Sequence, residues 1–397
     1  MSSTSAPTAK PRTPLKEVAL LFLRLGTTAF GGPAAHIAMM ENEVVRRRRW
    51  ITRERFLDLL GATNLIPGPN STEMAIHIGH QRAGWAGLVV AGACFIVPAS
   101  LITLGLAWVY VEFGARPQAG ALLYGVKPVI IAIVVQALWG LARTAVKSKP
   151  LAVLAVLAVA ATVLRVDEIV VLLAAGAIAA ASHSIATGGL QQSTDLGVWI
   201  GPSGGVTPIA TSVTTASTLV VPFGLTPLFF FFLKVGAILF GSGYVLLAFL
   251  RADLVDHWRW LTDAQLLDAV AIGQVTPGPV FSTATFIGYV LGGVPGALVA
   301  TVGIFLPSFV FVAASGPLVP RLRRSAIAGA FLDGVIVGSL ALMATVTFTL
   351  GRAAIVDVTT ALLAAASAFL LLRFRVNSAW LVLGGALVGL AAAALPG

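Results

Sequence analysis

The chain has 397 residues, of which 57% are hydrophobic and 11% are charged, and its formal net charge is +10. Soluble domains carry about 25% charged residues, so this composition excludes a soluble protein and indicates an integral membrane protein. Most Lys and Arg lie between apolar runs, where basic residues mark cytoplasmic loops and contact anionic headgroups. We therefore expect no nucleic-acid partner. One cysteine, Cys94, and five scattered histidines exclude an internal disulfide and offer no metal-ligand spacing.

Apolar runs follow one another along most of the chain, behind a Ser-, Thr- and Pro-rich tail over residues 1–14 that we expect to be disordered. A membrane helix needs about 20 apolar residues. The candidate spans are residues 17–40, 86–111, 121–142, 150–164, 168–187, 227–248, 295–316, 326–350, 354–372 and 378–395. Residues 56–82 and 266–291 are predicted to be re-entrant or discontinuous helices. Residues 188–226, rich in Gly, Ser, Thr and Pro, are predicted to be a linker.

The tripeptide Pro-Gly-Pro occurs twice, as Pro67-Gly68-Pro69 and as Pro277-Gly278-Pro279. Proline fixes φ and lacks an amide hydrogen, so each copy predicts a helix break. Residue types that cap a helix start follow the two breaks: Asn70, Ser71, Thr72, Ser282 and Thr283. Lipid cannot satisfy the amides exposed at a break, and the start of a helix attracts anions. We therefore predict an anion site at these breaks, with a kink that serves only helix packing as the alternative.

The chain consists of two related halves, predicted as residues 15–187 and 227–397. A shift of 210 residues aligns Phe22–Gly26 with Phe232–Gly236 and superimposes the two Pro-Gly-Pro elements. With one residue deleted, the alignment continues through glycines and prolines of both halves. Identical residues therefore recur at equivalent positions over most of both halves. This indicates an internal repeat rather than two independent Gly- and Pro-rich segments.

The two halves differ in the charge of equivalent loops. Residues 41–55 hold six Arg and three Glu, whereas the equivalent residues 251–263 hold two Arg and three Asp. The positive-inside rule then places equivalent loops on opposite sides of the membrane. We predict an all-α protein of two inverted repeats with about five spans each, which is typical of secondary transporters. This count puts the N-terminus outside, although Lys10, Arg12 and Lys16 favour the cytoplasm, unless the first span is broken near Gly31-Gly32-Pro33.

Three motifs make the chain resemble the chromate ion transporter family in its long, two-domain form. They are Phe30-Gly31-Gly32-Pro33-Ala34-Ala35-His36-Ile37, Leu65-Ile66-Pro67-Gly68-Pro69-Asn70-Ser71-Thr72-Glu73 and Thr276-Pro277-Gly278-Pro279. The resemblance covers about residues 15–395. It implies export of chromate from the bacterial cytoplasm across the inner membrane, driven by the proton motive force, and hence chromate resistance. In the second half Val280 and Phe281 replace Asn70 and Ser71, so the two half-sites are expected to contribute unequally.

Arg24 and Lys234 occupy the same repeat position inside apolar spans. A cation buried in a membrane helix is by default a functional hypothesis, and two of them could jointly neutralise a dianion. The alternative is that both side chains snorkel to an interface. The predicted substrate-binding residues are this pair, Gly31 and Gly32, and the five residues that follow the breaks: Asn70, Ser71, Thr72, Ser282 and Thr283.

Glu73 and His36 are the predicted candidates for proton coupling. Glu73 lies just inside a helix start, where it could instead stabilise the helix dipole. His36 could titrate near neutral pH, or could be a hydrogen-bonded structural histidine. The run Arg46–Arg49 is interpreted as a topology and headgroup signal rather than as a vestibule that collects anions.

The sequence as a whole predicts a secondary active transporter for chromate that works by alternating access. A transporter or channel for sulfate or another small anion is the alternative. No nucleophile–base constellation, phosphate-binding loop or carboxylate pair is present, so we expect no enzyme activity, no cofactor and no metal site. The expected partners are the oxyanion and membrane lipids, with a homodimer as the candidate assembly.

Overall fold

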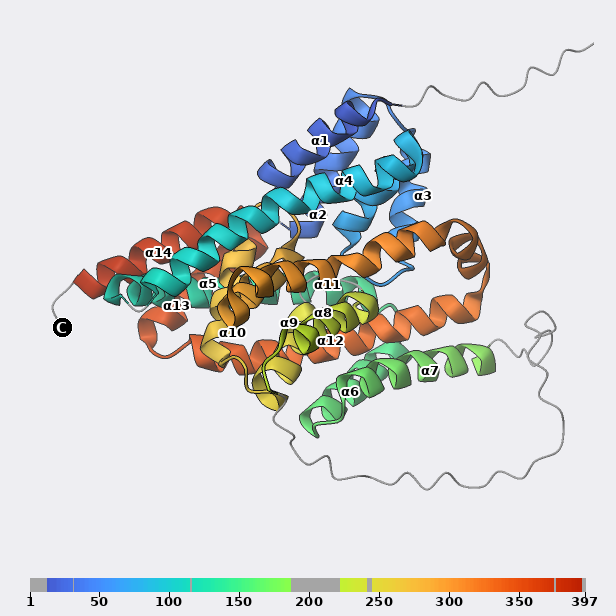
Figure 1. The fold of residues 1–397 in the computed structure, drawn as a ribbon. Helices are drawn as coiled ribbons and strands as arrows, with labels where there is room; N and C mark the ends of the chain where they lie inside the picture. The colour runs from blue at the N-terminus through green and yellow to red at the C-terminus, as the bar shows by residue number, and fades with distance from the viewer. Residues whose placement is uncertain are drawn as a thin grey trace, which may run out of the picture.

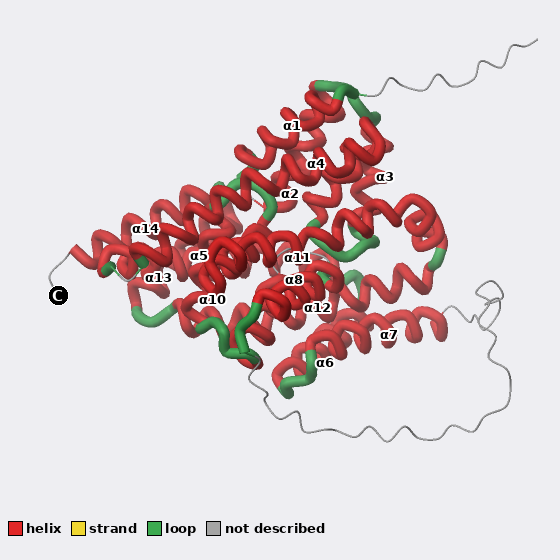
Figure 2. The backbone as a smooth tube through the Cα atoms, viewed as in Figure 1, coloured by secondary structure: helices red, strands yellow, loops and turns green. Residues whose placement is uncertain are grey.

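The computed structural model describes residues 13–30, 32–114, 116–186, 222–240, 245–374 and 376–394, with only the backbone described over 316–324. The secondary structure of these residues is helical throughout, without strands, as the sequence predicts (Figures 1 and 2). Five helices are long and apolar enough to cross a membrane. Residues 1–12 of the predicted tail, residues 188–221 of the predicted linker, and Gly31 lie outside the described residues.

The first half contains eight helical elements in the described residues. They are α1 (Leu15–Thr28), α2 (Gly32–Glu41), the π-helical η1 (Asn42–Arg47), α3 (Arg53–Thr63), α4 (Asn70–Phe113), α5 (Pro117–Ala145), α6 (Lys149–Val163) and α7 (Glu168–Ala186). The second half has α8 (Leu225–Ile238), α9 (Leu246–Phe249), η3 (Leu250–His257), α10 (Asp263–Val275), η4 (Val280–Ser282), α11 (Thr283–Arg324), α12 (Ala326–Ala354), α13 (Val358–Phe374) and α14 (Ser378–Ala394). The two halves thus present their main helices in the same order.

The predicted first span, residues 17–40, is not one helix. α1 ends at Thr28 and α2 begins at Gly32, whose φ of 77° lies in the left-handed region that favours glycine. Pro33 follows in the first turn of α2, where proline is tolerated but cannot continue the preceding helix. The alternative of a break near Gly31-Gly32-Pro33 therefore agrees with the structure better than a single continuous span.

α4 reverses its direction at Ala83 and Gly84, where the backbone leaves the helical region and Gly84 has a φ of 65°. The two arms pack tightly, because a Cβ at Gly79 would lie 2.3 Å from the carbonyl oxygen of Gly87. α11 has the same reversal at Gly292 and Gly293. The arm over residues 70–82 is thus a short half-helix, and the arm over 85–113 is a long span.

The reversal of α4 lies beside two other surface segments. The guanidinium of Arg82 donates to Thr13 Oγ1 (Nε–Oγ1 2.7 Å) and to the carbonyl oxygen of Trp50 (NH1–O 3.0 Å). The start of α1, the end of η1 and the reversal of α4 therefore share one face, which we call face A. The chain starts at face A with α1 and comes back to it at the end of η1. It then leaves again with α3 and returns to face A through the first arm of α4.

The long arm of α4 leads from face A to the opposite face, which we call face B, and α5 returns. Lys147, after α5, pairs with Asp333 near the start of α12 (Nζ–Oδ1 2.7 Å), which places that start at face A. The α6–α7 turn lies at the other end of these helices. It lines a cavity with η3, so η3 lies at face B, whereas its counterpart η1 lies at face A.

Small residues bring helices of the two halves into close contact. Gly125 of α5 lies against the backbone of Gly385 in α14, and Gly389 lies against Ala121, so these helices run antiparallel. α12 and α7 repeat this packing, with Gly334 against the backbone of Ala175. Without side chains between them the backbones approach closely, which is how membrane helices gain packing energy. The core therefore joins each half to the other.

Candidate functional site

The two Pro-Gly-Pro loops cross between the halves. The amide of Gly68 donates to the carbonyl oxygen of Leu239 at the end of α8 (2.8 Å), and the amide of Gly278 donates to that of Ala29 at the end of α1 (2.9 Å). Each loop thus binds the end of the other half's first helix. This reciprocal pair of hydrogen bonds ties each Pro-Gly-Pro loop to the first helix of the other half.

The helix that follows the first loop begins with unsatisfied amides. Pro69 is the N-cap of α4, and no side chain caps the helix, so the predicted capping by Asn70, Ser71 or Thr72 is wrong. The side chain of Asn70 donates instead to Asn64 Oδ1 (2.8 Å). Among the described residues, no hydrogen bond uses the backbone amides of Asn70 and Ser71. A helix start with free amides is a ready seat for an anion.

The second loop offers fewer free groups. The hydroxyl of Thr283 donates to the carbonyl oxygen of Val280 (2.8 Å), and Ser282 Oγ accepts from Thr103 Oγ1 of α4 (3.2 Å). In contrast, Thr72 Oγ1 is buried without a partner among the described residues. The difference agrees with the prediction that the two half-sites are unequal.

Glu73 is fully buried in the first turn of α4, and neither carboxylate oxygen has a hydrogen-bond partner among the described residues. A Cβ atom at Gly68 would lie 2.3 Å from Glu73 Oε1 and 3.0 Å from the hydroxyl of Ser308 in α11. Ser308 Oγ is likewise buried and unpartnered there. Glu73 and Ser308, one from each half, therefore lie together against the first Pro-Gly-Pro loop.

Arg24 and Lys234 are each paired with a carboxylate of their own half. Arg24 NH2 lies 2.7 Å from Glu43 Oε1 in η1, and Lys234 Nζ lies 2.5 Å from Asp253 Oδ2 in η3. Glu43 and Asp253 occupy the same repeat position. No hydrogen bond or ion pair among the described residues joins either cation to the other or to a Pro-Gly-Pro loop. Both are too exposed to be called buried cations, at 51% for Arg24 and 37% for Lys234.

A second nitrogen-bearing side chain, not identified from the sequence, contacts the carboxylate in each of these clusters. Arg47 NH1 contacts the same Glu43 oxygen as Arg24 (2.5 Å), and His257 Nδ1 lies 3.3 Å from Asp253 Oδ1. Arg47 and His257 also share a repeat position. The alignment of the two halves could have identified both clusters, because an acidic and a basic residue occur at equivalent positions in each half.

The charge state of Glu43 follows from these contacts. Burial alone would raise the pKa of this carboxyl, but the hydrogen bond from Arg47 and the charge of Arg24 outweigh burial and hold the pKa below its ordinary value. Glu43 therefore stays ionised at neutral pH. The stability it contributes is present above its unfolded-state pKa and is lost as the pH falls through the lower, folded-state pKa.

His36 is a structural hydrogen-bonding residue in this arrangement. Its ring is buried, contacts the edge of Phe95, and places Nε2 3.1 Å from the carbonyl oxygen of Ala29. The amide of Gly278 donates to that same carbonyl oxygen. Of the two predicted coupling residues, His36 thus supports the crossing of the loops through Nε2, while its Nδ1 has no partner among the described residues. Glu73 has no partner for either carboxylate oxygen there. Gly32 begins α2, and no hydrogen bond joins it to the loops in the part of the chain that the structure describes.

A buried cluster that the sequence reasoning missed joins α4 and α5 to α10. Lys127 Nζ lies 3.1 Å from Asp268 Oδ1, and Tyr110 Oη donates to Asp268 Oδ2 (2.9 Å). The signal was visible, because Lys127 is the one charged residue in the predicted span 121–142.

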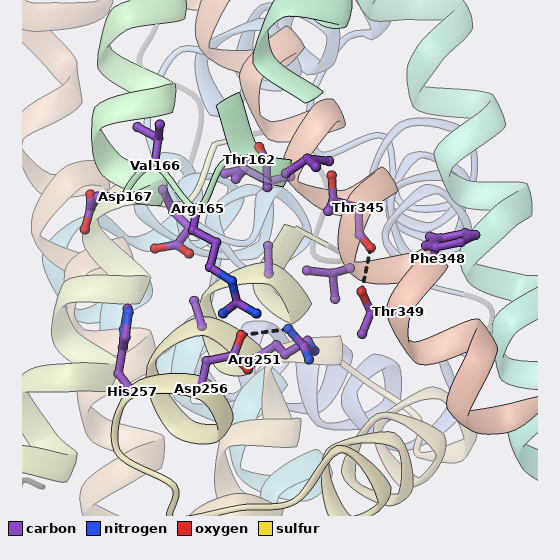
Figure 3. Close-up of a pocket in the computed structure, with 16 residues that line it drawn as sticks. Thr162, Arg165, Val166, Asp167, Arg251, Asp256, His257, Thr345, Phe348 and Thr349 are labelled. Atoms are coloured by element: carbon purple, nitrogen blue, oxygen red, sulfur yellow. Dashed lines mark hydrogen bonds and ion pairs between the residues drawn. The ribbon is translucent and has the colours of Figure 1, made fainter. Parts of the chain in front are cut away.

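A cavity of about 400 Å³ lies between the α6–α7 turn, η3 and α12 (Figure 3). The Arg165 side chain points into it toward Arg251 and Asp256, and Arg251 is held by Asp256 (NH1–Oδ2 2.7 Å) and Asp263 (Nε–Oδ1 2.9 Å). None of the predicted site residues lines this cavity. It is thus distinct from the crossing of the Pro-Gly-Pro loops.

Comparison with known proteins relates the chain to transporters. The family model described as chromate transporter matches residues 16–180 and again residues 226–390. The chain is 34% identical to a chromate transport protein of Cupriavidus metallidurans, over 96% of this chain and 94% of the relative. It is 33% identical to a chromate transport protein of Pseudomonas aeruginosa (83% and 80%) and 30% identical to a probable chromate transport protein of Synechococcus elongatus (89% and 88%). No solved structure matches the chain.

Proposed function

Because this chain belongs to the chromate transporter family, we propose that it is a secondary active transporter that exports chromate across the bacterial inner membrane by alternating access. The chain is a multi-pass membrane protein. The observation that carries the proposal is the reciprocal pair of hydrogen bonds, Gly68 to Leu239 and Gly278 to Ala29. A site to which both halves contribute can be exposed to either side as the halves move.

The proposed anion seat lies at the first Pro-Gly-Pro loop. The free amides of Asn70 and Ser71 and the unpartnered hydroxyl of Thr72 supply donors, and the dipole of α4 favours negative charge. In the second half, Ser282 and Thr283 are engaged with protein atoms and contribute less. The seat is therefore asymmetric, with most of its donors on α4.

Arg24 is proposed to deliver the oxyanion to this seat from face A. Arg24 and Arg47 converge on one oxygen of Glu43, which is an arrangement of two guanidinium groups that a tetrahedral oxyanion also fits. Lys234 and His257 form the weaker equivalent in the second half. In this proposal an incoming oxyanion competes with the carboxylate for the guanidinium groups.

Arg24→Gln is expected to weaken chromate affinity at least tenfold, with normal insertion because Glu43 keeps its contact with Arg47. Glu43→Gln is the matched control. It removes the competing negative charge while leaving Arg24 in place, so affinity should stay the same or rise. Chromate binding to purified protein measures both variants. If both substitutions weakened chromate affinity equally, the Arg24–Glu43 ion pair would serve only to hold α1 against η1.

Opposite orientation of the two halves is supported by the packing of equivalent helices. α5 runs antiparallel to α14, and α12 runs antiparallel to α7. Since α7 follows α5 through one intervening helix, α6, these two run in the same direction, and so do α12 and α14. α5 and its counterpart α12 must then run in opposite directions. We propose that the halves are inverted repeats.

The distribution of basic residues favours face A as the cytoplasmic face. Basic residues gather at the chain segments on face A: Arg46, Arg47, Arg48, Arg49, Arg143, Lys147, Lys149, Arg321, Arg323 and Arg324. By the positive-inside rule this face is the cytoplasm. The start of α1 also lies on face A, which agrees with the cytoplasmic side that the basic residues Lys10, Arg12 and Lys16 favour. The predicted external N-terminus followed from counting residues 17–40 as a single span.

Single cysteines at Thr52 and Thr262, in a Cys94→Ser background, are expected to react with an impermeant thiol reagent from opposite sides of the membrane. The two threonines are well matched, because each is the N-cap of its helix and its loss costs about 1 kcal/mol. The reaction of each cysteine is measured in intact cells and in everted vesicles, which expose opposite sides of the membrane to the reagent. Reaction of both cysteines from the same side would contradict inverted repeats.

We propose Glu73 as the proton-coupling residue. An ionised carboxylate that is buried without a hydrogen-bond partner costs several kcal/mol, so this site favours a bound proton. Its counterpart in the second half is Thr283, and the counterpart of Ser308 is Ala99, which lies against Gly278. Only one of the two loops therefore carries a titratable group.

Uptake of radiolabelled chromate into everted membrane vesicles tests the substrate. We expect uptake that depends on the protein and that a tenfold excess of sulfate reduces by less than half. Sulfate, another tetrahedral dianion, is the second candidate, because free amides and guanidinium groups do not by themselves distinguish the two. Complete inhibition by equimolar sulfate, or uptake equal to that of vesicles without the protein, would contradict chromate as the substrate.

A further inference from the structure

Equivalent helices of the two halves are packed differently. α10 packs against α5, α12 and α14, whereas the main neighbour of its counterpart α3 among the described elements is α4. The difference is large for single residues at the same repeat position. Leu57 of α3 is 51% exposed, and Leu267 of α10 is 1% exposed. One half therefore has its third helix docked on the membrane helices, and the other half does not.

The docked helix is held by the buried ion pair. The side chain of Asp268 is 5% exposed and contacts Lys127 of α5, with Tyr110 of α4 donating to its second oxygen. Asp58, the counterpart of Asp268, is 53% exposed and lies 4.0 Å from Arg55 of its own helix. A buried ion pair contributes little net stability, and intramembrane charges are costly, so this pair calls for a functional explanation.

The ion pair lies toward face B. α10 begins after η3, which lies on face B, and Asp268 comes soon after that beginning. α10 also leads into the second Pro-Gly-Pro loop, which binds the end of α1. A movement of α10 away from α5 would therefore separate Lys127 from Asp268 and would also shift this loop. The exposed counterpart α3 begins at face A.

We propose that Lys127 and Asp268 form a gate on face B, that Tyr110 orients Asp268, and that the structure is the state in which the path is open to face A. This inference rests on the proposed alternating access. In the opposite state α3 docks and α10 separates. The counterpart of Lys127 in α12 is Ile336, so no equivalent ion pair can form there. The gate therefore stabilises only the state open to face A.

Lys127→Met/Asp268→Asn tests the gate without leaving an unpaired buried charge. Lys147→Met/Asp333→Asn is the matched control, because this ion pair likewise joins the α5 region to a helix of the second half, α12, but is more exposed and lies at face A. The reporters are single cysteines at Leu57 and Leu267 in a Cys94→Ser background. A charged, impermeant thiol reagent is applied from each side.

With both native ion pairs intact, we expect Leu57→Cys to react from face A and Leu267→Cys to be protected. In the gate variant, reaction of Leu267→Cys from face B should rise at least tenfold while reaction of Leu57→Cys falls. The control variant should behave like the parent. Unchanged labelling in the gate variant, the same change in the control, or increased reaction at both positions would overturn the gate.

Chromate flux by the same variants separates this inference from the proposed function. If the parent transports chromate but labelling does not shift in the gate variant, the gate is wrong and the function stands. If the parent transports no chromate, the proposed function fails whatever the labelling shows. We expect the gate variant to change the maximal transport rate more than the concentration of half-maximal transport, since the pair is not among the donors of the proposed anion seat.

Discussion

Gly68→Ala and Gly278→Ala should each reduce chromate transport at least tenfold. Gly68 has a φ of 135° and Gly278 a φ of 88°, where a side chain strains the backbone by about 1–2 kcal/mol. A Cβ at Gly68 would also lie 2.3 Å from Glu73 Oε1, and one at Gly278 would lie 2.9 Å from the carbonyl oxygen of Gly26. Both loops would have to move, and with them the crossing that forms the site.

Gly84→Ala is the control that separates strain from lack of space. Gly84 has a φ of 65°, but a Cβ there would have no neighbour within 4 Å. This variant should therefore lose some stability and keep most of its transport at matched membrane levels. Chromate flux and membrane abundance are measured for all three variants. Equal losses of flux would show that backbone strain alone, and not the packing of the loops, limits transport.

Glu73→Gln is expected to abolish accumulation of chromate against a gradient while leaving chromate–chromate exchange. Glutamine has nearly the same shape but cannot release a proton, so the anion seat persists without its coupling group. The variant should fold, because the buried carboxylate has no hydrogen-bond partner to lose among the described residues. Flux driven by an imposed pH gradient and exchange flux at equal pH are the two measurements.

Two further variants make the Glu73 result specific. Thr283→Val changes the equivalent position of the second half, and Ser308→Ala removes the hydroxyl next to Glu73 at Gly68. We expect Thr283→Val to retain uphill transport and Ser308→Ala to weaken it, because the serine lies at the coupling site. If Glu73→Gln accumulates chromate normally, protons are coupled elsewhere and Glu73 only stabilises the start of α4.

Local sequence rules predicted the all-α membrane class well. Runs of apolar residues recur at helical length, and helices occupy the predicted spans, although α1 ends inside residues 17–40 and α8 ends inside residues 227–248. The positions of Pro67 and Pro277 also forecast where α3 and α10 end, because proline acts through local sterics. The single first span was wrong, because apolar length alone does not reveal the break between Thr28 and Gly32.

Pairings between distant residues were harder to predict. Glu43 lies 19 residues from Arg24, and only the α1–α2 reversal brings the two together. Asp268 meets Lys127 across the two halves, a contact that depends on how α10 docks on α5. Arg24 and Lys234 were therefore interpreted as isolated buried cations although both have acidic partners. Capping by Ser71 or Thr72 failed because Pro69 takes the N-cap position.

Chromate flux in proteoliposomes with an imposed pH gradient tests the central claim most directly. Purified protein is reconstituted with equal chromate on both sides, and a proton gradient is then imposed. A coupled transporter with one site accessible from either side in turn should move chromate against its own gradient until the proton gradient is spent, and an uncoupler should stop it. If chromate only equilibrates across the membrane, and its rate does not depend on the proton gradient, the account is contradicted and the protein is a passive channel.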